Sequence, residues 1–172
     1  MGRDLWSRGQ LGSLALLLIA ALLILRPWED GGRDRGPASA AALVARVVDG
    51  DTIEARISGQ LEDVRYIGVD TPETVKPDTP VQCFGPRAST FNHRLVEGRR
   101  VRLVFGVERR DVYGRLLAYV YLGGRFVNAI LVRRGLARSL TIPPNDRFAP
   151  LFRGLELRAA RRGRGLWGAC PP

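Results

Sequence analysis

The chain has 172 residues and a formal net charge of +10, and all but one of its 27 basic residues are arginine. Arginine binds phosphate through a forked guanidinium, so this composition favours nucleic acid, a phosphorylated ligand or an anionic membrane surface as partner. A genome rich in G and C is an alternative source of the arginine. One histidine and two cysteines without a CxxC motif exclude a structural zinc site.

The first 28 residues form a hydrophobic head. Arg3 and Arg8 precede an apolar run over residues 11–25, and charged residues rather than small ones follow it directly. The run is close to the upper limit of a signal-peptide core and slightly shorter than the roughly 20 residues that span a bilayer comfortably. We interpret residues 1–28 as an uncleaved signal anchor, with a cleaved signal peptide and a secreted domain as the alternative.

Residues 29–42 begin with charged residues alternating with Gly, Pro and Ser and offer no large apolar side chain to bury, which predicts a flexible linker. The folded domain is expected over residues 43–170. Its two cysteines, Cys83 and Cys170, are an even number behind an export-like head, which favours a disulfide and an extracytoplasmic domain. Such a bond would contribute roughly 4 kcal/mol in the chain-entropy model. Two separate free thiols are the alternative.

Short runs rich in Val and Ile predict five strands, at residues 43–48, 52–57, 63–69, 101–105 and 116–122. A tight turn at Asp49 and Gly50 predicts that the first two strands form a hairpin, and the third continues a meander.

Helical spacing of apolar residues predicts three helices, at residues 86–96, 126–134 and 147–162, of which the last is strongly basic. The order of these elements favours an α+β fold, a five-stranded antiparallel Greek-key barrel of OB type with three α-helices.

The sequence RYIGVDTPET, residues 65–74, holds an arginine and two carboxylates. Clustered charges are costly unless they pair, bind a metal or meet a charged substrate, so the segment indicates a hard cation and an anionic ligand. Strand alternation places Arg65 and Asp70 on opposite faces. Gly68 and Pro72 would allow the bend that brings them together.

Six motifs occur in order over residues 43–170: VDGDT, RYIGVDTPET, FGPRASTF, DVYGRLLAYVY, VNAILVRRGLA and GLW. In these motifs and their order the domain resembles the staphylococcal nuclease, or thermonuclease, family. The resemblance implies an OB-fold barrel with three helices and a calcium-dependent phosphodiesterase that acts on DNA and RNA.

The family's metal carboxylates match Asp51 and Asp70, and its metal-binding carbonyl matches Thr71. Two carboxylates, a carbonyl, waters and a phosphate oxygen form an oxygen-only shell suited to Ca²⁺, with weak binding on the order of 0.1 to 1 mM.

The resemblance also implies the catalytic groups. Glu73 matches the residue usually assigned as general base, Arg65 and Arg115 match two phosphate-binding arginines, and Tyr113 matches a tyrosine that hydrogen-bonds the terminal phosphate. The implied reaction is cleavage at the 5′-oxygen of single-stranded DNA and RNA by a monomer, leaving 3′-phosphates.

Two residues depart from the family pattern. Val112 replaces a lysine, and Leu140 stands where a base-stacking tyrosine is expected, so weaker substrate holding should raise KM more than it lowers kcat. Two other functions are kept as alternatives. One is a non-catalytic OB-fold module that binds nucleic acid at the membrane, and the other is an assembly protein that uses its basic helix on lipids.

Overall fold

An antiparallel meander of three strands starts the fold, because strands rich in β-branched residues flank a tight turn. Asp49 pairs with Thr52, so the turn residues are Gly50 and Asp51, one position later than the sequence predicts. The computed structural model describes residues 38–75 and 79–170. Its strands are β1 (Ser39–Asp49), β2 (Thr52–Ile57), β3 (Gln60–Tyr66), β4 (Val69–Asp70), β5 (Arg100–Arg110), β6 (Leu116–Leu122), β7 (Arg125–Phe126) and β8 (Arg138–Ser139). Its helices are α2 (Gly85–Val96), α3 (Val127–Arg133), α4 (Ala149–Arg161) and the short α5 (Leu166–Ala169).

Five of these strands close into a barrel. The order β3-β2-β1-β5-β6 is completed by a pairing of β3 with β6, and β7 extends the sheet beyond β6. The closing pair is parallel, with Val64 opposite Leu116 and Tyr66 opposite Ala118. The expectation of five antiparallel strands is therefore corrected to a mixed barrel. The α+β class is confirmed.

Two predicted boundaries differ from the structure. β1 begins at Ser39, so residues 39–42 pair with β5 although they were expected in the linker. The strand predicted over residues 63–69 stops at Tyr66, and the chain bends at Gly68, whose φ of +79° lies in the left-handed region. The following two residues, β4, pair with β8 in a separate small sheet.

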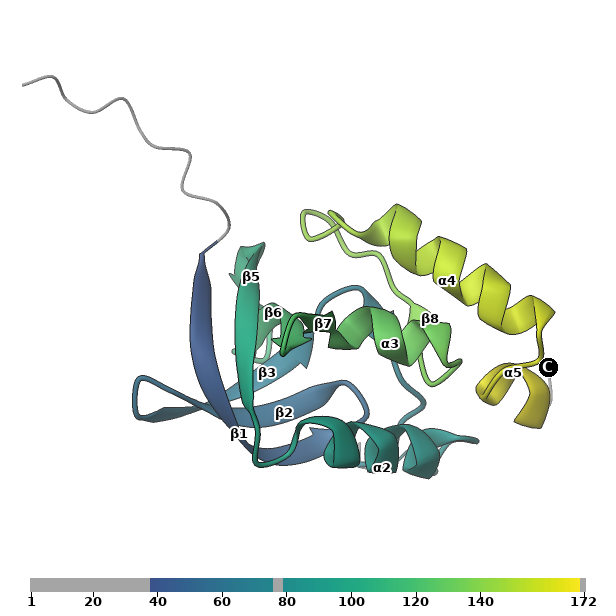
Figure 1. Cartoon of the computed structure of the whole chain (residues 1–172), viewed down its shortest axis with the longest axis horizontal. Coiled ribbons are helices and arrows are strands. Elements are labelled where there is room, and N and C mark those ends of the chain that lie inside the picture. Colours follow the sequence, from purple (N-terminus) through teal and green to yellow (C-terminus); the bar gives the residue numbers. More distant parts are fainter. Residues whose placement is uncertain (1–37, 76–78, 171–172) are drawn as a thin grey trace, which may run out of the picture. The chain divides into compact units, whose positions relative to one another are not determined.

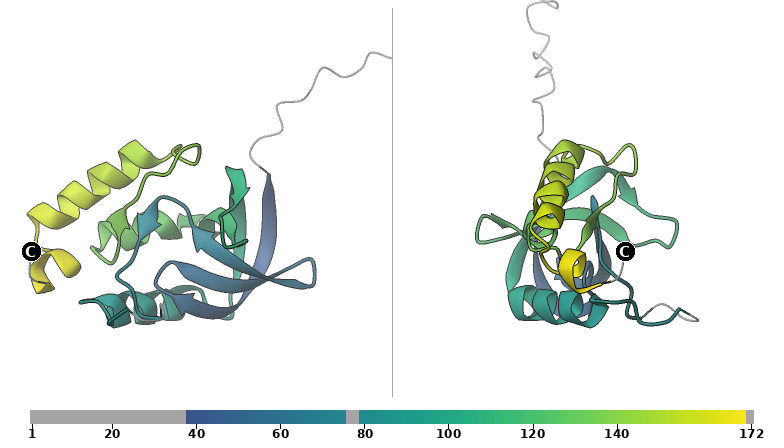
Figure 2. Two further views of the ribbon diagram at one scale, coloured as in Figure 1. Left: turned by 180° about the vertical axis from the view of Figure 1, so that it is seen from behind. Right: turned by 90° about the vertical axis from the view of Figure 1, so that its right-hand side faces the viewer.

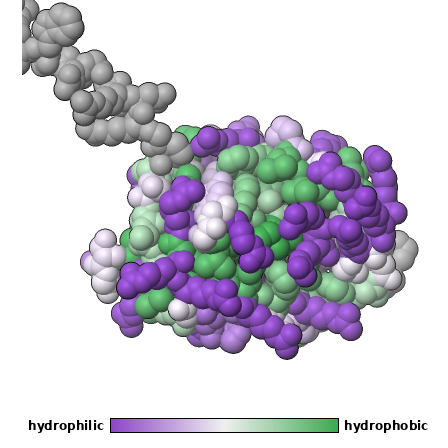
Figure 3. Space-filling view, in the orientation of Figure 1, coloured by the Kyte–Doolittle hydropathy of each residue, from purple (hydrophilic) through white to green (hydrophobic). Residues whose placement is uncertain are grey.

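The three predicted helices are present, each within two residues of its expected ends. Helix α2 packs against β1, and α4 packs on α3 (Figures 1 and 2). An aromatic cluster packs α4 against the rest of the domain. The rings of Phe148 and Phe152 both contact Phe126, and the ring centroids of Tyr119 and Phe148 lie 4.8 Å apart in an edge-to-face arrangement. The outer face of α4 carries exposed arginines, and hydrophilic side chains gather there on the surface (Figure 3).

The predicted disulfide between Cys83 and Cys170 is confirmed, with Cα atoms 5.8 Å apart. A structural disulfide is typical of compartments outside the cytoplasm. The expected anchor, residues 1–28, and residues 29–37 of the expected linker lie outside the described residues. Within the described ranges, each helix is too short or too polar to cross a bilayer.

Candidate active site

The turn between β1 and β2 presents Asp51 to a second segment of the chain. Asp51 is 5% exposed, and its Oδ2 accepts hydrogen bonds from the backbone N (2.7 Å) and the hydroxyl (2.9 Å) of Thr71. Its other oxygen, Oδ1, accepts a longer bond of 3.2 Å from Thr52. The hairpin and the segment after β4 are thus joined through one carboxylate, which leaves the backbone of Thr71 beside it.

The bend at Gly68 brings Asp70 round to Arg65. Arg65 Nη1 donates to the carbonyls of Tyr66 (3.0 Å) and Val69 (2.8 Å), which lie on either side of the bend. Its Nη2 donates to Asp70 Oδ1 at 2.9 Å, and Nη1 lies 3.2 Å from Asp51 Oδ2. One guanidinium therefore contacts both predicted metal carboxylates. The bend inferred from Gly68 is present.

Glu73 follows Thr71 along the same irregular segment. Its Oε1 accepts the backbone N–H groups of Thr74 (2.9 Å) and Val75 (2.8 Å), which orient the carboxylate. Its own backbone N donates to Gln82 Oε1 at 3.0 Å, and its carbonyl accepts from the backbone N of Gln82 at 2.9 Å.

A tight turn before β6 carries Arg115. Asp111 Oδ1 accepts the backbone N–H groups of Tyr113 and Arg115, each at 3.0 Å, while its Oδ2 pairs with Arg115 Nε at 2.7 Å. The Asp111 carboxylate thus shapes the turn and aims the guanidinium. The parallel pairing of β3 with β6 then sets this turn next to Arg65.

All seven predicted metal, catalytic and substrate-binding residues line one open pocket of about 550 Å³. They are Asp51, Arg65, Asp70, Thr71, Glu73, Tyr113 and Arg115. The two cysteines of the site prediction are absent from this pocket's lining and form the disulfide instead. Residues far apart in sequence therefore converge on a single cavity that presents both carboxylates and guanidiniums.

Each ionised carboxylate in the pocket makes ionisation of its neighbours less favourable. Partial burial raises the pKa of Asp70, Arg65 opposes this shift, and the charges of Asp51 and Glu73 raise it further. Burial also raises the pKa of Asp49, against hydrogen bonds from Thr74 and Gly50, and Asp51 and Glu73 add to the shift. A bound divalent cation would relieve this repulsion.

The residues present fit a hard cation. Among the described residues, no three His, Cys, Asp or Glu side chains form a group that could hold a metal. The expected shell needs only two, Asp51 and Asp70, together with the Thr71 carbonyl, water and substrate oxygen. Both carboxylates line the same pocket, and the donor set is entirely oxygen, which suits Ca²⁺.

Two residues that support the site were missed in the sequence. Asp111 begins the DVYGR motif, but no role is assigned to it from the sequence. Its spacing of four residues from Arg115 within a turn is the one signal that could have indicated the pair. Gln82 lies in a polar stretch without any periodic pattern. Its contact with Glu73 depends on the folded path of the chain, and no sequence signal marks it.

The chain is similar to known nucleases. A family model described as "Staphylococcal nuclease homologue" matches residues 63–169. Thermonuclease of Staphylococcus intermedius is 49% identical over 163 residues, which cover 91% of this chain and 95% of that protein. Thermonuclease of Staphylococcus hyicus is 37% identical over 88% of this chain and 94% of its own length. Endonuclease YncB of Bacillus subtilis is 44% identical over 71% of this chain and 59% of its own length.

Proposed function

Because the chain belongs to the staphylococcal nuclease family, we propose that it is a metal-dependent nuclease that hydrolyses the phosphodiester bonds of DNA and RNA. The observation that carries the proposal is that three carboxylates and two arginines line one pocket. They are Asp51, Asp70, Glu73, Arg65 and Arg115. A non-catalytic binding module would need the basic surface but not this group of acids.

Asp51, Asp70 and the carbonyl of Thr71 would hold Ca²⁺. When bound, the ion would neutralise charge on the phosphate and orient it for attack. Asp51 is already oriented by the Thr71 N–H and hydroxyl groups, so the site needs little rearrangement of this carboxylate on binding.

Glu73 would act as general base. Its carboxylate is held by two backbone N–H groups and faces the same pocket, where it can orient a water molecule for in-line attack on phosphorus. Arg65 and Arg115 would donate to the equatorial oxygens of the phosphate, on which charge builds up. Tyr113, 81% exposed at the rim, would hydrogen-bond a terminal phosphate. Cleavage at the 5′-oxygen would leave a 3′-phosphate.

A neighbouring apolar pocket of about 350 Å³ is suited to a nucleobase. Leu117, Leu140 and Ile142 line it, and it shares Arg65, Tyr113 and Arg115 with the catalytic pocket. A base there would rest on aliphatic side chains, which stack less strongly than an aromatic ring. Unpaired bases reach such a pocket most readily, which favours single-stranded substrates.

The strand order and the helix between the third and fourth barrel strands support an OB-type barrel. We further propose that the domain works as a monomer outside the cytoplasm, tethered through residues 1–28. The disulfide supports the compartment, and the apolar run at residues 11–25 supports the tether.

The test uses the full chain with single-stranded DNA or RNA, in Ca²⁺ or in excess chelator. Activity should require Ca²⁺, and the products should carry 3′-phosphates. Glu73→Gln should lower kcat by about 10²-fold or more, as expected for loss of a general base. Glu62→Gln is the matched control. Glu62 lies on β3, forms an ion pair with Arg110 and does not line the catalytic pocket, so this variant should retain activity. A Glu73→Gln enzyme with unchanged kcat would remove Glu73 from the reaction.

A further inference from the structure

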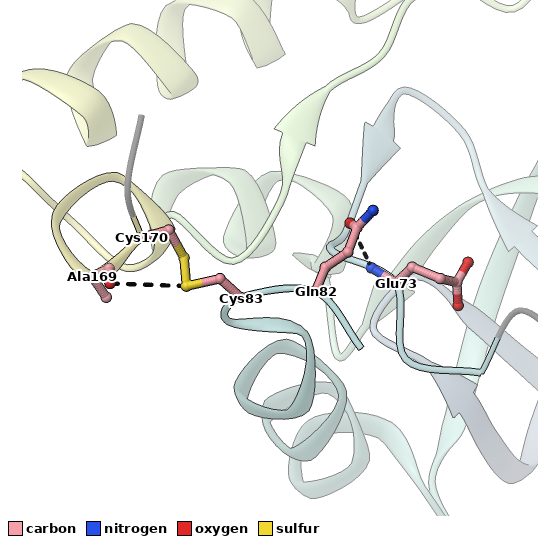
Figure 4. Close-up of a disulfide and its surroundings, with 5 residues drawn as sticks. All are labelled: Glu73, Gln82, Cys83, Ala169 and Cys170. Atoms are coloured by element: carbon pink, nitrogen blue, oxygen red, sulfur yellow. Dashed lines mark hydrogen bonds between the residues drawn. A yellow bond between two sulfur atoms is a disulfide. The ribbon is translucent and has the colours of Figure 1, made fainter. Parts of the chain in front are cut away.

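Glu73 is hydrogen-bonded to Gln82, which is not among the residues that line the catalytic pocket. Gln82 joins it by two hydrogen bonds in opposite directions, from Glu73 N to Gln82 Oε1 (3.0 Å) and from Gln82 N to the Glu73 carbonyl (2.9 Å). This pairing connects two positions nine residues apart, and Figure 4 draws the bond from Glu73 N to the Gln82 side chain. Since Glu73 lies outside helices and strands, Gln82 supplies backbone partners that no regular element provides.

The start of α2 supports Glu73 from a second side. Gly85 N donates to the Gln82 carbonyl at 3.0 Å. A Cβ on Gly85 would lie 2.9 Å from the Pro72 carbonyl and 3.0 Å from the Glu73 carbonyl, so only glycine permits this close approach. The backbone of residues 72–73 is therefore packed directly against the residues that begin α2.

The disulfide immediately follows Gln82. Cys83 is bonded to Cys170, at the end of α5 (Figure 4). Helix α5 is itself anchored, because Leu166 is 3% exposed and its backbone N donates to the Gly135 carbonyl at 2.8 Å. The covalent bond thus connects an exposed segment next to the catalytic pocket to a packed part of the domain.

From these contacts we propose that Gln82 is a positioning residue for Glu73, and that the Cys83–Cys170 disulfide holds Gln82 in place. The proposal rests on the proposed nuclease function, in which Glu73 is the general base. A dithiol reductant in the surroundings would convert the disulfide to two thiols and become a disulfide itself, and this reduction would lower turnover by loosening Glu73, in addition to any loss of stability. The activity of the folded enzyme would depend on the redox state of its surroundings.

Variants of Gln82 test the first half of the proposal. Gln82→Met keeps the length of the side chain and removes the acceptor, whereas Gln82→Glu keeps an acceptor oxygen. Gln82→Met should lower kcat by about 10-fold, within the range expected for a small misplacement of a catalytic group. KM and the Ca²⁺ dissociation constant from calorimetry should change less than about twofold, because the metal carboxylates are held by other contacts. Gln82→Glu should restore most of kcat, and Gln60→Met, the same exchange on an exposed strand residue, should have no effect.

The second half is tested with the Cys83→Ser/Cys170→Ser protein, assayed well below its melting temperature. Its kcat should fall as in Gln82→Met, and adding Gln82→Met should lower it little further, because both changes act through one contact. Full kcat in the folded double-serine protein would limit the disulfide to a stabilising role. Equal kcat in Gln82→Met and wild type would overturn the role of Gln82.

Backbone amide exchange separates this proposal from the proposed function. Loss of the Gln82 acceptor should increase the exchange rate of the Glu73 N–H by about 10-fold or more, measured by NMR in chelator without substrate. An inactive wild-type chain would refute the nuclease function, yet the amide would still report the contact. An unchanged exchange rate would refute the contact, whatever the activity.

Discussion

Gly68→Ala should destabilise the domain more than the same change at a positive-φ glycine with open surroundings. Gly68 has φ +79° between β3 and β4, and a Cβ built on it would lie 2.3 Å from Phe152 Cε2 and 2.6 Å from Cδ2. Carbon atoms normally approach to about 3.5 to 4.0 Å, so the overlap exceeds 1 Å. Phe152 is 1% exposed within the aromatic cluster, so its ring has little room to move.

Two costs add at this position. A non-glycine residue in left-handed backbone costs about 1 to 3 kcal/mol, and overpacking of a core costs about 1 to 3 kcal/mol. We therefore expect a loss of about 4 kcal/mol in the free energy of unfolding, a large share of the roughly 5 to 15 kcal/mol typical of a domain. Asp70, two residues further along, should also be displaced, so activity should fall even where the protein remains folded.

Urea denaturation in chelator measures the loss, with Gly124→Ala as matched control. Gly124 has the same φ of +79° and no atom within 4 Å of its built Cβ, so that variant should lose only the backbone cost. The difference between the two variants isolates the contact with Phe152. Phe152→Leu combined with Gly68→Ala should cost less than the sum of the single changes. Equal losses in Gly68→Ala and Gly124→Ala would refute the packing argument.

Three further predictions concern other parts of the domain. Burial raises the pKa of Tyr66, which is 1% exposed, so its neutral form is favoured in the folded state. The stabilisation is complete below the unfolded-state pKa of about 10 and is lost as pH rises above it, by up to about 1.4 kcal/mol per pH unit. In urea denaturation between pH 10 and 12, the free energy of unfolding of Tyr66→Phe should therefore fall less steeply than that of the wild type. An equally steep fall in both proteins would contradict this. Replacing Cys83 and Cys170 by Ser should lower the free energy of unfolding by about 4 to 5 kcal/mol, because the bond joins residues 87 apart; a loss below 1 kcal/mol in calorimetry would show that the unbonded chain is already constrained. Leu140→Tyr should lower KM for single-stranded DNA about 5-fold or more by adding a stacking surface, with kcat nearly unchanged; a change in kcat alone would place Leu140 elsewhere in the reaction.

The local elements of the fold were predictable because local rules determine them. β-Branched runs and the Asp49–Gly50 turn predicted the meander, and apolar spacing predicted the three helices. The parallel closure of β3 on β6 was not predicted, because it joins segments about fifty residues apart and leaves no periodic signal. Residues 39–42, mostly alanine, have a linker-like composition, yet Ala42 is 4% exposed because β5 pairs alongside it.

The residues of the site also fall into two groups, those that the sequence indicates and those that only the folded structure reveals. Arg65, Asp70 and Glu73 stand out in the sequence because charged residues cluster in a short motif, and Gly68 correctly indicated the bend that brings Arg65 and Asp70 together. Asp51 was selected through the family resemblance, and its place in the same pocket depends on the fold. Gln82 could not be found, since its role arises from backbone partners that exist only once α2 is placed beside residues 72–73. Side chains that act on substrate are easier to detect in a sequence than those that act through another residue.

The short parallel pairing between β3 and β6 has a consequence for how such chains can diverge. Three residue pairs align the strand that carries Arg65 with the one that follows Arg115, and the chain between them contains β4, α2, β5 and the loops that connect them. Insertions or deletions in these loops can change the length of the chain between β3 and β6 without altering the distance between the two guanidiniums. A one-residue shift in the pairing of β3 with β6 would instead turn Arg65 toward the barrel interior and separate it from Arg115 in a single step.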